Sequence, residues 1–212
     1  LGVPRDEPRK ADDYVRYATS VAARKSNIVA LGLVGKEGAQ PVGQFERAFQ
    51  TAEKKGVPRV PHAGELQGAD GIQKVIEALL PSRIADGWGA AESQDILNTL
   101  VAQQIPLDLS LVRPVKLKKI AGYADYPLRK LVDDGVTITI GSDMPALFKT
   151  TLSDQYHAIV RDLGFSIEAL EKLALNAVRA SFLPDDEKQA MLERFQQEYA
   201  TLRAEHLESQ GA

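Results

Sequence analysis

The sequence contains no cysteine, so it can form neither disulfide bonds nor a zinc site built on thiolates. This absence leaves the redox compartment open. Histidine is scarce as well, with three residues in the chain, so any metal site has few imidazole ligands to draw on. No apolar run approaches the ~18 residues that a membrane-spanning helix requires, and we expect no contact with a membrane.

A strong charge of either sign is also lacking, since the formal net charge is -3 at pH 7. A chain with this balance offers no basic surface, so we expect no nucleic-acid partner. No signal peptide is visible, and we expect a cytoplasmic location. The first residue is leucine rather than methionine, which leads us to expect a cleaved, truncated or engineered end.

What is present is an ordinary globular composition. The 212 residues are 44% hydrophobic and 26% charged, which predicts a single domain over 1–212 with a substantial core. Short β-rich runs alternate with stretches whose apolar residues recur at helical spacing. The expected strands are 27–34, 56–62, 82–86, 105–112 and 136–142.

Amphipathic helices are predicted between these strands, with one more helix near 11–24, before the first strand. Ser166 is a candidate N-cap for a helix that runs to about 181. Pro184 opens a final charged amphipathic helix over 185–209, which we expect to wrap the outside. The apolar stripes of the intervening helices lie around 45–52, 72–79, 96–101, 128–132 and 156–163.

The alternation of strands and helices indicates an α/β fold made of parallel βα units. The expected strands are almost continuously apolar, as is typical of a sheet covered by helices. Five units are too few to close an eight-stranded barrel, which takes about 250 residues. The pattern alone leaves two folds open: an incomplete barrel of the TIM type that lacks its first units, or an open doubly wound sheet.

Ionisable side chains gather where the expected strands end, and function in parallel α/β folds sits at that edge. His62 and Glu65 follow the second strand. A neutral imidazole can hold a cation and a neighbouring carboxylate can move protons, as a metal-assisted hydrolase requires. Asp86 ends the third strand and Asp143 the fifth. An unpaired carboxylate is costly after an apolar strand, so we expect Asp143 to pair with a metal, with His62 or with Lys36.

The residues at these strand ends resemble the motifs of the adenosine and adenine deaminase family. The resemblance extends through the helices that end near Phe182, so it covers nearly the whole chain. It implies a (β/α)8 barrel, of which this chain would be the C-terminal part with about five βα units. The similar stretches are His62-Ala63-Gly64-Glu65, Arg83-Ile84-x-x-Gly87, 107–114, Ser142-Asp143-x-Pro145 and Thr150-Thr151-Leu152.

The family hydrolyses the amino group of adenine or adenosine with the help of one zinc ion. The resemblance therefore implies zinc as a cofactor and a purine nucleoside or base as the ancestral substrate. It assigns zinc binding to His62 and Asp143, and protonation of the purine ring to Glu65. It also implies that the backbone of Gly35 contacts the purine.

Several positions depart from the pattern of the family. The H-x-H zinc ligands do not occur in the sequence, and the segment that should carry them would precede Leu1. Asp86 stands where the family has the histidine that orients the attacking water, and the run 110–114 replaces C-P-T-S-N. Because the scaffold matches while the strand ends differ, we expect a site rebuilt by divergence or by deliberate redesign.

Two substitutions change the expected substrate contacts. Met144 replaces the second aspartate of S-D-D-P, which contacts the purine in the family, and the bulky Trp88 follows the R-I-G-H-G motif. Both side chains are candidates for an apolar wall of a binding pocket. Trp88 could stack on an aromatic ligand, and it can equally well fill space in the core.

The ionisable positions also have ordinary structural interpretations. Glu65 can serve simply as the hydrogen-bond partner of His62. Asp86 is open to three readings: a third metal ligand, a replacement catalytic base or a solvated carboxylate. Arg113 either clamps an anion or only begins a loop.

We therefore expect a deaminase-like hydrolase scaffold whose own deamination is absent or very slow, because two protein ligands make a weak zinc site. Two alternatives stay open. Another polypeptide supplies the missing barrel units and completes an active zinc hydrolase, or the barrel binds a small molecule or a protein without catalysis. An open sheet edge invites aggregation, so we expect a second copy, a complementary barrel chain or the terminal helices to cover it.

Overall fold

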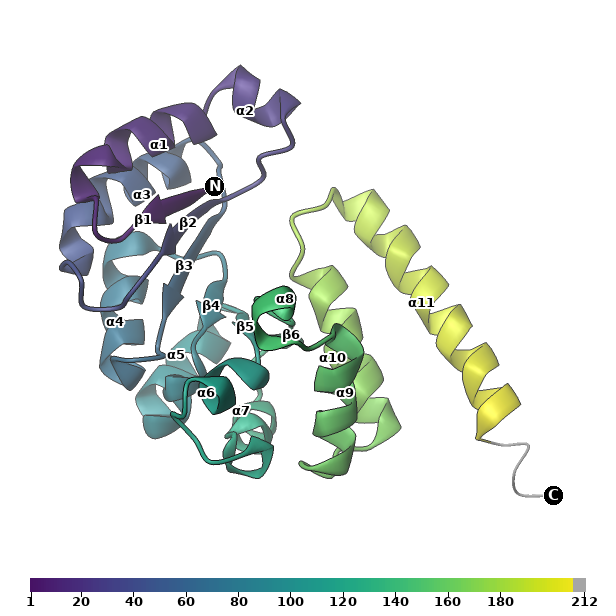
Figure 1. Cartoon of the computed structure of the whole chain (residues 1–212). Coiled ribbons are helices and arrows are strands. Elements are labelled where there is room, and N and C mark those ends of the chain that lie inside the picture. Colours follow the sequence, from purple (N-terminus) through teal and green to yellow (C-terminus); the bar gives the residue numbers. More distant parts are fainter. Residues whose placement is uncertain (208–212) are drawn as a thin grey trace.

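Six parallel strands form one sheet whose spatial order follows the sequence from β1 to β6. The computed structural model describes residues 1–207 (Figure 1). In the described chain β1 and β6 are the two ends of the strand order, so the barrel is incomplete, as predicted. A doubly wound sheet would reverse its strand order, and this alternative is excluded. The strands are β1 Gly2–Pro4, β2 Leu31–Val34, β3 Arg59–Ala63, β4 Ile84–Asp86, β5 Leu107–Leu109 and β6 Ile138–Ile140.

The first strand is one that the hydrophobic pattern does not predict. β1 is three residues long and includes Pro4, which a strand tolerates at a sheet edge. It pairs with β2 through Val3, which lies opposite Leu33. The sheet therefore has one more strand than expected. The other strands overlap the predicted runs but are shorter, and β3 ends one residue beyond its predicted run 56–62. The run 105–112, for example, gives way to α6 at Val112.

Helices follow the strands and cover the sheet, with α1, α3, α4 and α5 along one side of it in Figure 1. The helix expected near 11–24 is split in two, because the Ser20 side chain accepts a hydrogen bond from the Ala23 N–H at 3.1 Å and starts a new helix. Ser166 caps α10 as predicted, through the Ala169 N–H at 3.3 Å. The helices are α1 Ala11–Ala18, α2 Val21–Lys25, α3 Glu46–Lys54, α4 Gly68–Leu79, α5 Gln94–Ala102, α6 Val112–Lys116, α7 Leu128–Asp133, α8 Pro145–Phe148, α9 Leu152–Arg161, α10 Ile167–Arg179 and α11 Asp185–His206. Four 3-10 helices complete the described chain, η1 Pro8–Lys10, η2 Val42–Phe45, η3 Trp88–Glu92 and η4 Tyr123–Asp125.

The core lies between the strands and the helices that cover them. Apolar side chains of alternate strand residues are fully buried, and the helices contribute their apolar stripes to the same cluster. Burial of one such side chain contributes about 1.5–3 kcal/mol. The fully buried members include Leu31, Leu33, Phe45, Phe49, Ile72, Leu79, Ile84, Leu97, Leu100 and Leu107.

The last helix stands apart from this core. α10 packs against β6, and α11 packs against α10 (Figure 1). No residue of α11 is buried. Arg203 joins the two helices through both oxygens of Glu171. The helix was predicted over 185–209, and positions 208 and 209 lie outside the described residues. None of the described helices is both long and apolar enough to cross a bilayer.

Candidate functional site

A cleft of about 620 Å³ opens at the carboxyl ends of the strands. It gathers eight of the residues singled out from the sequence, although they are far apart along the chain. Strands that run in one direction bring their carboxyl ends to one edge, which explains the convergence. The lining residues are Val34, Gly35, Lys36, His62, Glu65, Leu66, Ala85, Asp86, Arg113, Leu117, Asp143 and Met144.

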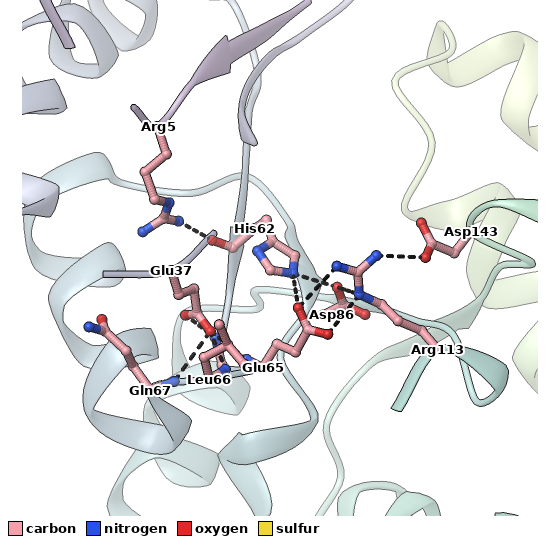
Figure 2. Close-up of polar contacts among 10 residues, drawn as sticks. Arg5, Glu37, His62, Glu65, Leu66, Gln67, Asp86, Arg113 and Asp143 are labelled. Atoms are coloured by element: carbon pink, nitrogen blue, oxygen red, sulfur yellow. Dashed lines mark hydrogen bonds and ion pairs between the residues drawn. The ribbon is translucent and has the colours of Figure 1, made fainter. Parts of the chain in front are cut away.

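The imidazole of His62 lies between two carboxylates (Figure 2). Its Nε2 atom is 2.7 Å from an oxygen of Asp86 and 3.3 Å from an oxygen of Glu65. Nε2 makes these contacts as an ion pair, because neither oxygen meets the geometry of an aligned ring N–H hydrogen bond. His62 is thus held by charge among side chains that are almost completely buried.

The guanidinium of Arg113 enters the same cluster from α6. Its Nε and Nη2 atoms donate to the two oxygens of Glu65 at 2.9 and 3.1 Å. Its Nη1 atom donates to Asp143 at 2.9 Å, and Nε lies 3.6 Å from Asp86. Arg113 therefore joins the carboxylates that follow three different strands, as Figure 2 shows.

These contacts shift the acid–base behaviour of the cluster. Burial works against protonation of His62, but the contacts with Asp86 and Glu65 outweigh it and raise the pKa of His62 to about 9. Burial alone would raise the pKa of Glu65, yet His62 and Arg113 hold that pKa at about 2. The same carboxylates raise the pKa of Arg113. Near neutral pH the cluster is consequently a network of ion pairs.

Two of the acidic residues sit on unusual backbone. The φ angles are +64° at Asp86 and +54° at Asp143, in the left-handed region. Residues other than glycine adopt this region at a cost of about 1–3 kcal/mol, and such residues cluster at functional sites. Both left-handed residues lie at or just after a strand end, and both line the cleft.

The turn between His62 and Glu65 depends on a glycine. Gly64 has a φ of +82°, and a Cβ atom there would lie 2.6 Å from the Cδ1 atom of Ile72. Only glycine satisfies both conditions. The spacing of the imidazole and the carboxylate therefore rests on a residue that cannot be replaced without strain.

Glu37 is a supporting residue that sequence reasoning did not identify. Glu37 is 4% exposed, and its carboxylate accepts hydrogen bonds from backbone N–H groups of the loop that carries Glu65. The donors are Gly64 at 2.7 Å, Glu65 at 2.8 Å, Gln67 at 3.3 Å and Leu66. These N–H groups precede α4 and would otherwise lack partners. The signal in the sequence was its position three residues after the end of β2.

Arg5 is the second residue of this kind. It follows β1, is 1% exposed, and donates a hydrogen bond to the backbone carbonyl of His62 (Figure 2). Burial lowers the pKa of Arg5, and the charge of Glu37 opposes that shift. Because the strand before Arg5 was not predicted, nothing in the sequence placed this residue near the cleft.

Trp88 does not reach the cleft, in contrast to the wall expected from the sequence. It lies in η3 and packs against the core, with its ring centroid 6.3 Å from that of Tyr126. The left-handed turn at Gly87, with a φ of +83°, separates it from Asp86, which does line the cleft. Met144, 41% exposed, lies at the cleft as expected.

Three ligand atoms converge in a way that could hold a metal ion. Those of His62, Glu65 and Asp86 all lie within 4.8 Å of one another. Asp143, expected to share a zinc ion with His62, is bound to Arg113 instead. The guanidinium of Arg113 lies beside these ligand atoms, 2.9 Å from Glu65 and 3.6 Å from Asp86, and its positive charge opposes the binding of a second cation. The ligand atoms therefore converge, but the charges around them do not fit a zinc ion.

Comparison with known proteins gives a consistent family. The model of the family described as adenosine deaminase matches residues 4–198. An adenosine deaminase of Haemophilus ducreyi is 32% identical over 178 residues, which are 84% of this chain and 52% of that protein. The chain thus spans about half the length of the curated relatives that it matches.

Solved structures agree in fold. The adenine deaminase of Arthrobacter aurescens superimposes with a TM-score of 0.85 at 30% identity, covering 94% of this chain and 60% of the other. An amidohydrolase of Burkholderia ambifaria with bound zinc gives a TM-score of 0.86 at 22% identity, over 96% and 57% of the two chains. The zinc-bound neighbour shares the fold of this chain.

Proposed function

The chain belongs to the adenosine deaminase family, and from this membership we propose that its cleft binds a purine nucleoside or base. We propose in addition that this chain by itself deaminates such a ligand slowly or not at all. The relatives named above are an adenosine deaminase and an adenine deaminase. The volume of the cleft, about 620 Å³, is in the usual range for small-molecule sites.

The contacts that a purine would meet come from three strand ends. Gly35 offers its backbone, as the family resemblance implies, and Met144 and Leu66 offer apolar surface. A flat aromatic ring is suited to such a mixture of backbone polar groups and apolar side chains. Asp86 and Glu65 line the same cleft and are candidates for proton transfer.

One observation carries the proposal of weak or absent turnover. Glu65 is paired with both His62 and Arg113, which keeps it ionised. A general acid works best when its pKa is near the working pH, and the pKa of Glu65 is about 2. The role of proton donor that the resemblance assigns to Glu65 therefore has no proton to draw on at neutral pH.

An active zinc hydrolase assembled with further barrel units is the second candidate. It is supported by the unclosed sheet between β6 and β1 and by the left-handed aspartates at the cleft. In such an assembly, additional imidazoles would join His62 and Asp143 as zinc ligands. A second polypeptide that co-purifies in equal amount, with about one zinc per assembly, would favour this function; a monomer without zinc would count against it.

The first experiment measures purine binding and turnover on the same sample. Adenosine and adenine are added to the chain while its melting temperature is recorded, and ammonia release is followed with and without zinc. We expect an increase in Tm without ammonia release. Turnover of roughly 1 per second, typical of enzymes, would overturn the proposed loss of activity, and an unchanged Tm at millimolar purine would overturn the proposed ligand.

A pair of variants ties the binding to the cleft. Met144→Trp fills the cleft at its rim, so we expect it to abolish the purine-induced increase in Tm. Leu147→Trp is the matched control, because Leu147 lies in α8, for which Met144 is the N-cap residue, is 68% exposed and does not line the cleft. Equal responses of the two variants to purine would place the binding site elsewhere.

A further inference from the structure

Three carboxylates meet in the cleft at a density that requires compensating positive charge. The side chains of Glu65, Asp86 and Asp143 are 4%, 9% and 29% exposed. Like charges in a partly buried site repel strongly unless cations lie between them. His62 compensates Glu65 and Asp86, but it makes no ion pair with Asp143.

Arg113 supplies the missing positive charge, and the planar shape of its guanidinium lets it contact two carboxylates at once. Its side chain is 20% exposed. The two parallel hydrogen bonds to Glu65 are the fork geometry that arginine forms with carboxylates. The remaining Nη1 atom is free to bind Asp143. A single guanidinium thus holds carboxylates from the ends of β3 and β6.

The geometry points to Arg113 as a built-in cation that takes the place of a divalent metal ion in this cleft. It holds Glu65 and Asp143 in position and keeps metal out of the His62, Glu65 and Asp86 group. Without Arg113, the same carboxylates would accept a divalent cation such as Zn²⁺. This inference shares its cleft with the proposed purine site but does not depend on purine binding.

The size of the effect follows from electrostatics. A divalent ion among the ligand atoms of His62, Glu65 and Asp86 would lie roughly 5 Å from the guanidinium, since Arg113 contacts two of these residues. Even with the dielectric constant of water, repulsion at this distance weakens binding at least about tenfold. We therefore expect Zn²⁺ to bind Arg113→Ser at least about tenfold more tightly than it binds the wild type.

The test uses the full chain without a histidine tag and Zn²⁺ as the probe. Zinc stoichiometry and affinity are measured by equilibrium dialysis, and Tm is recorded with and without zinc. Arg113→Lys keeps the charge and should exclude zinc as the wild type does. Arg47→Ser is the matched control, because Arg47 is exposed and lies 3.5 Å from Asp12 in a surface ion pair.

In the absence of metal, Arg113→Ser should melt below the wild type. At a zinc concentration about 100-fold above its dissociation constant, its Tm should rise by roughly 5–10 °C. The wild type, Arg113→Lys and Arg47→Ser should respond little. If Arg113→Ser is not recovered folded, Arg113→Gln, which keeps a neutral donor, replaces it.

Two results would overturn the inference. In the first, the wild type and Arg113→Ser bind zinc with equal affinity. In the second, Arg113→Ser or Arg113→Gln has the wild-type Tm, and zinc does not change it. The double variant Glu65→Gln/Arg113→Ser should lose the zinc response, because it removes one ligand; a retained response would place the metal elsewhere. Purine-induced shifts measured on the same samples report on the proposed function separately, so either proposal can fail alone.

Discussion

Replacement of Glu37 by glutamine tests how the cleft is held together. One oxygen of Glu37 accepts the N–H of Gly64 at 2.7 Å, and the other accepts from Glu65 at 2.8 Å and from the next two residues. Glutamine keeps one accepting oxygen. If this oxygen takes the place of the one that faces Glu65, Leu66 and Gln67, it retains those three hydrogen bonds. Its amide nitrogen then faces the N–H of Gly64, which is buried and loses its partner.

The magnitude can be worked from these contacts. A hydrogen bond to a charged group contributes about 1.5–3 kcal/mol, and an unsatisfied buried donor costs about 1–3 kcal/mol. Glu37→Gln loses one such bond and weakens the others, so we expect the free energy of unfolding to fall by about 2–4 kcal/mol. For a chain of this size the Tm should fall by roughly 5–15 °C.

The assay is urea unfolding, with hydrogen exchange as a local readout. Exchange of the Glu65 and Leu66 amides should accelerate in Glu37→Gln, because their acceptor has lost its charge. Glu46→Gln is the control, since Glu46 is exposed and bonded to Gln50 on the helix surface; it should change stability by less than about 0.5 kcal/mol. A similarly small change in Glu37→Gln would refute the role assigned to this carboxylate.

Three further predictions concern the same region. The pKa of His62 is raised to about 9, so its contribution to stability should be complete below about pH 6.5 and be lost as the pH rises through 9. The pKa of Glu65 is lowered to about 2, so its contribution should be lost only as the pH falls from about 4.5 through 2. Urea unfolding across pH 2–10 measures both effects, and His62→Gln should remove the loss of stability at alkaline pH. Gly64→Ala should destabilise the chain by more than about 1 kcal/mol, because the new methyl group would meet Ile72 at 2.6 Å on a backbone with positive φ; an unchanged Tm would contradict this. Trp88→Phe should lower the Tm yet leave any purine-induced shift intact, because Trp88 packs against the core and does not line the cleft; loss of the purine response would indicate that Trp88 contributes to the binding site.

The sequence predicted the convergence of the cleft better than its contacts. His62, Glu65, Asp86 and Asp143 meet because each follows a strand, and parallel strands end at one edge whatever their exact lengths. The same argument wrongly placed Trp88 at the cleft. The left-handed turn at Gly87 follows the strand, and the side chain of Trp88 packs against the core.

The contacts that hold the site could not be read from the pattern. Arg113 reaches Glu65 across 48 residues, and Glu37 reaches the Glu65 N–H across 28. Neither separation along the sequence corresponds to a helical or strand period, so only the folded chain reveals these partners. β1 was not predicted for a simpler reason, since three residues are too few to show an alternation of apolar and polar side chains.

Consecutive strand pairing has a consequence for the way the chain folds. Every strand pairs with its neighbour in sequence, as Ile84 does with Leu107, so the sheet can grow one crossover at a time with only short-range loop closures. The bond between Arg113 and Glu65 spans several of these steps. During refolding we expect the sheet to assemble first and the ion pairs of the charged cluster to form last. The cleft would then reach its final geometry only when the scaffold is complete.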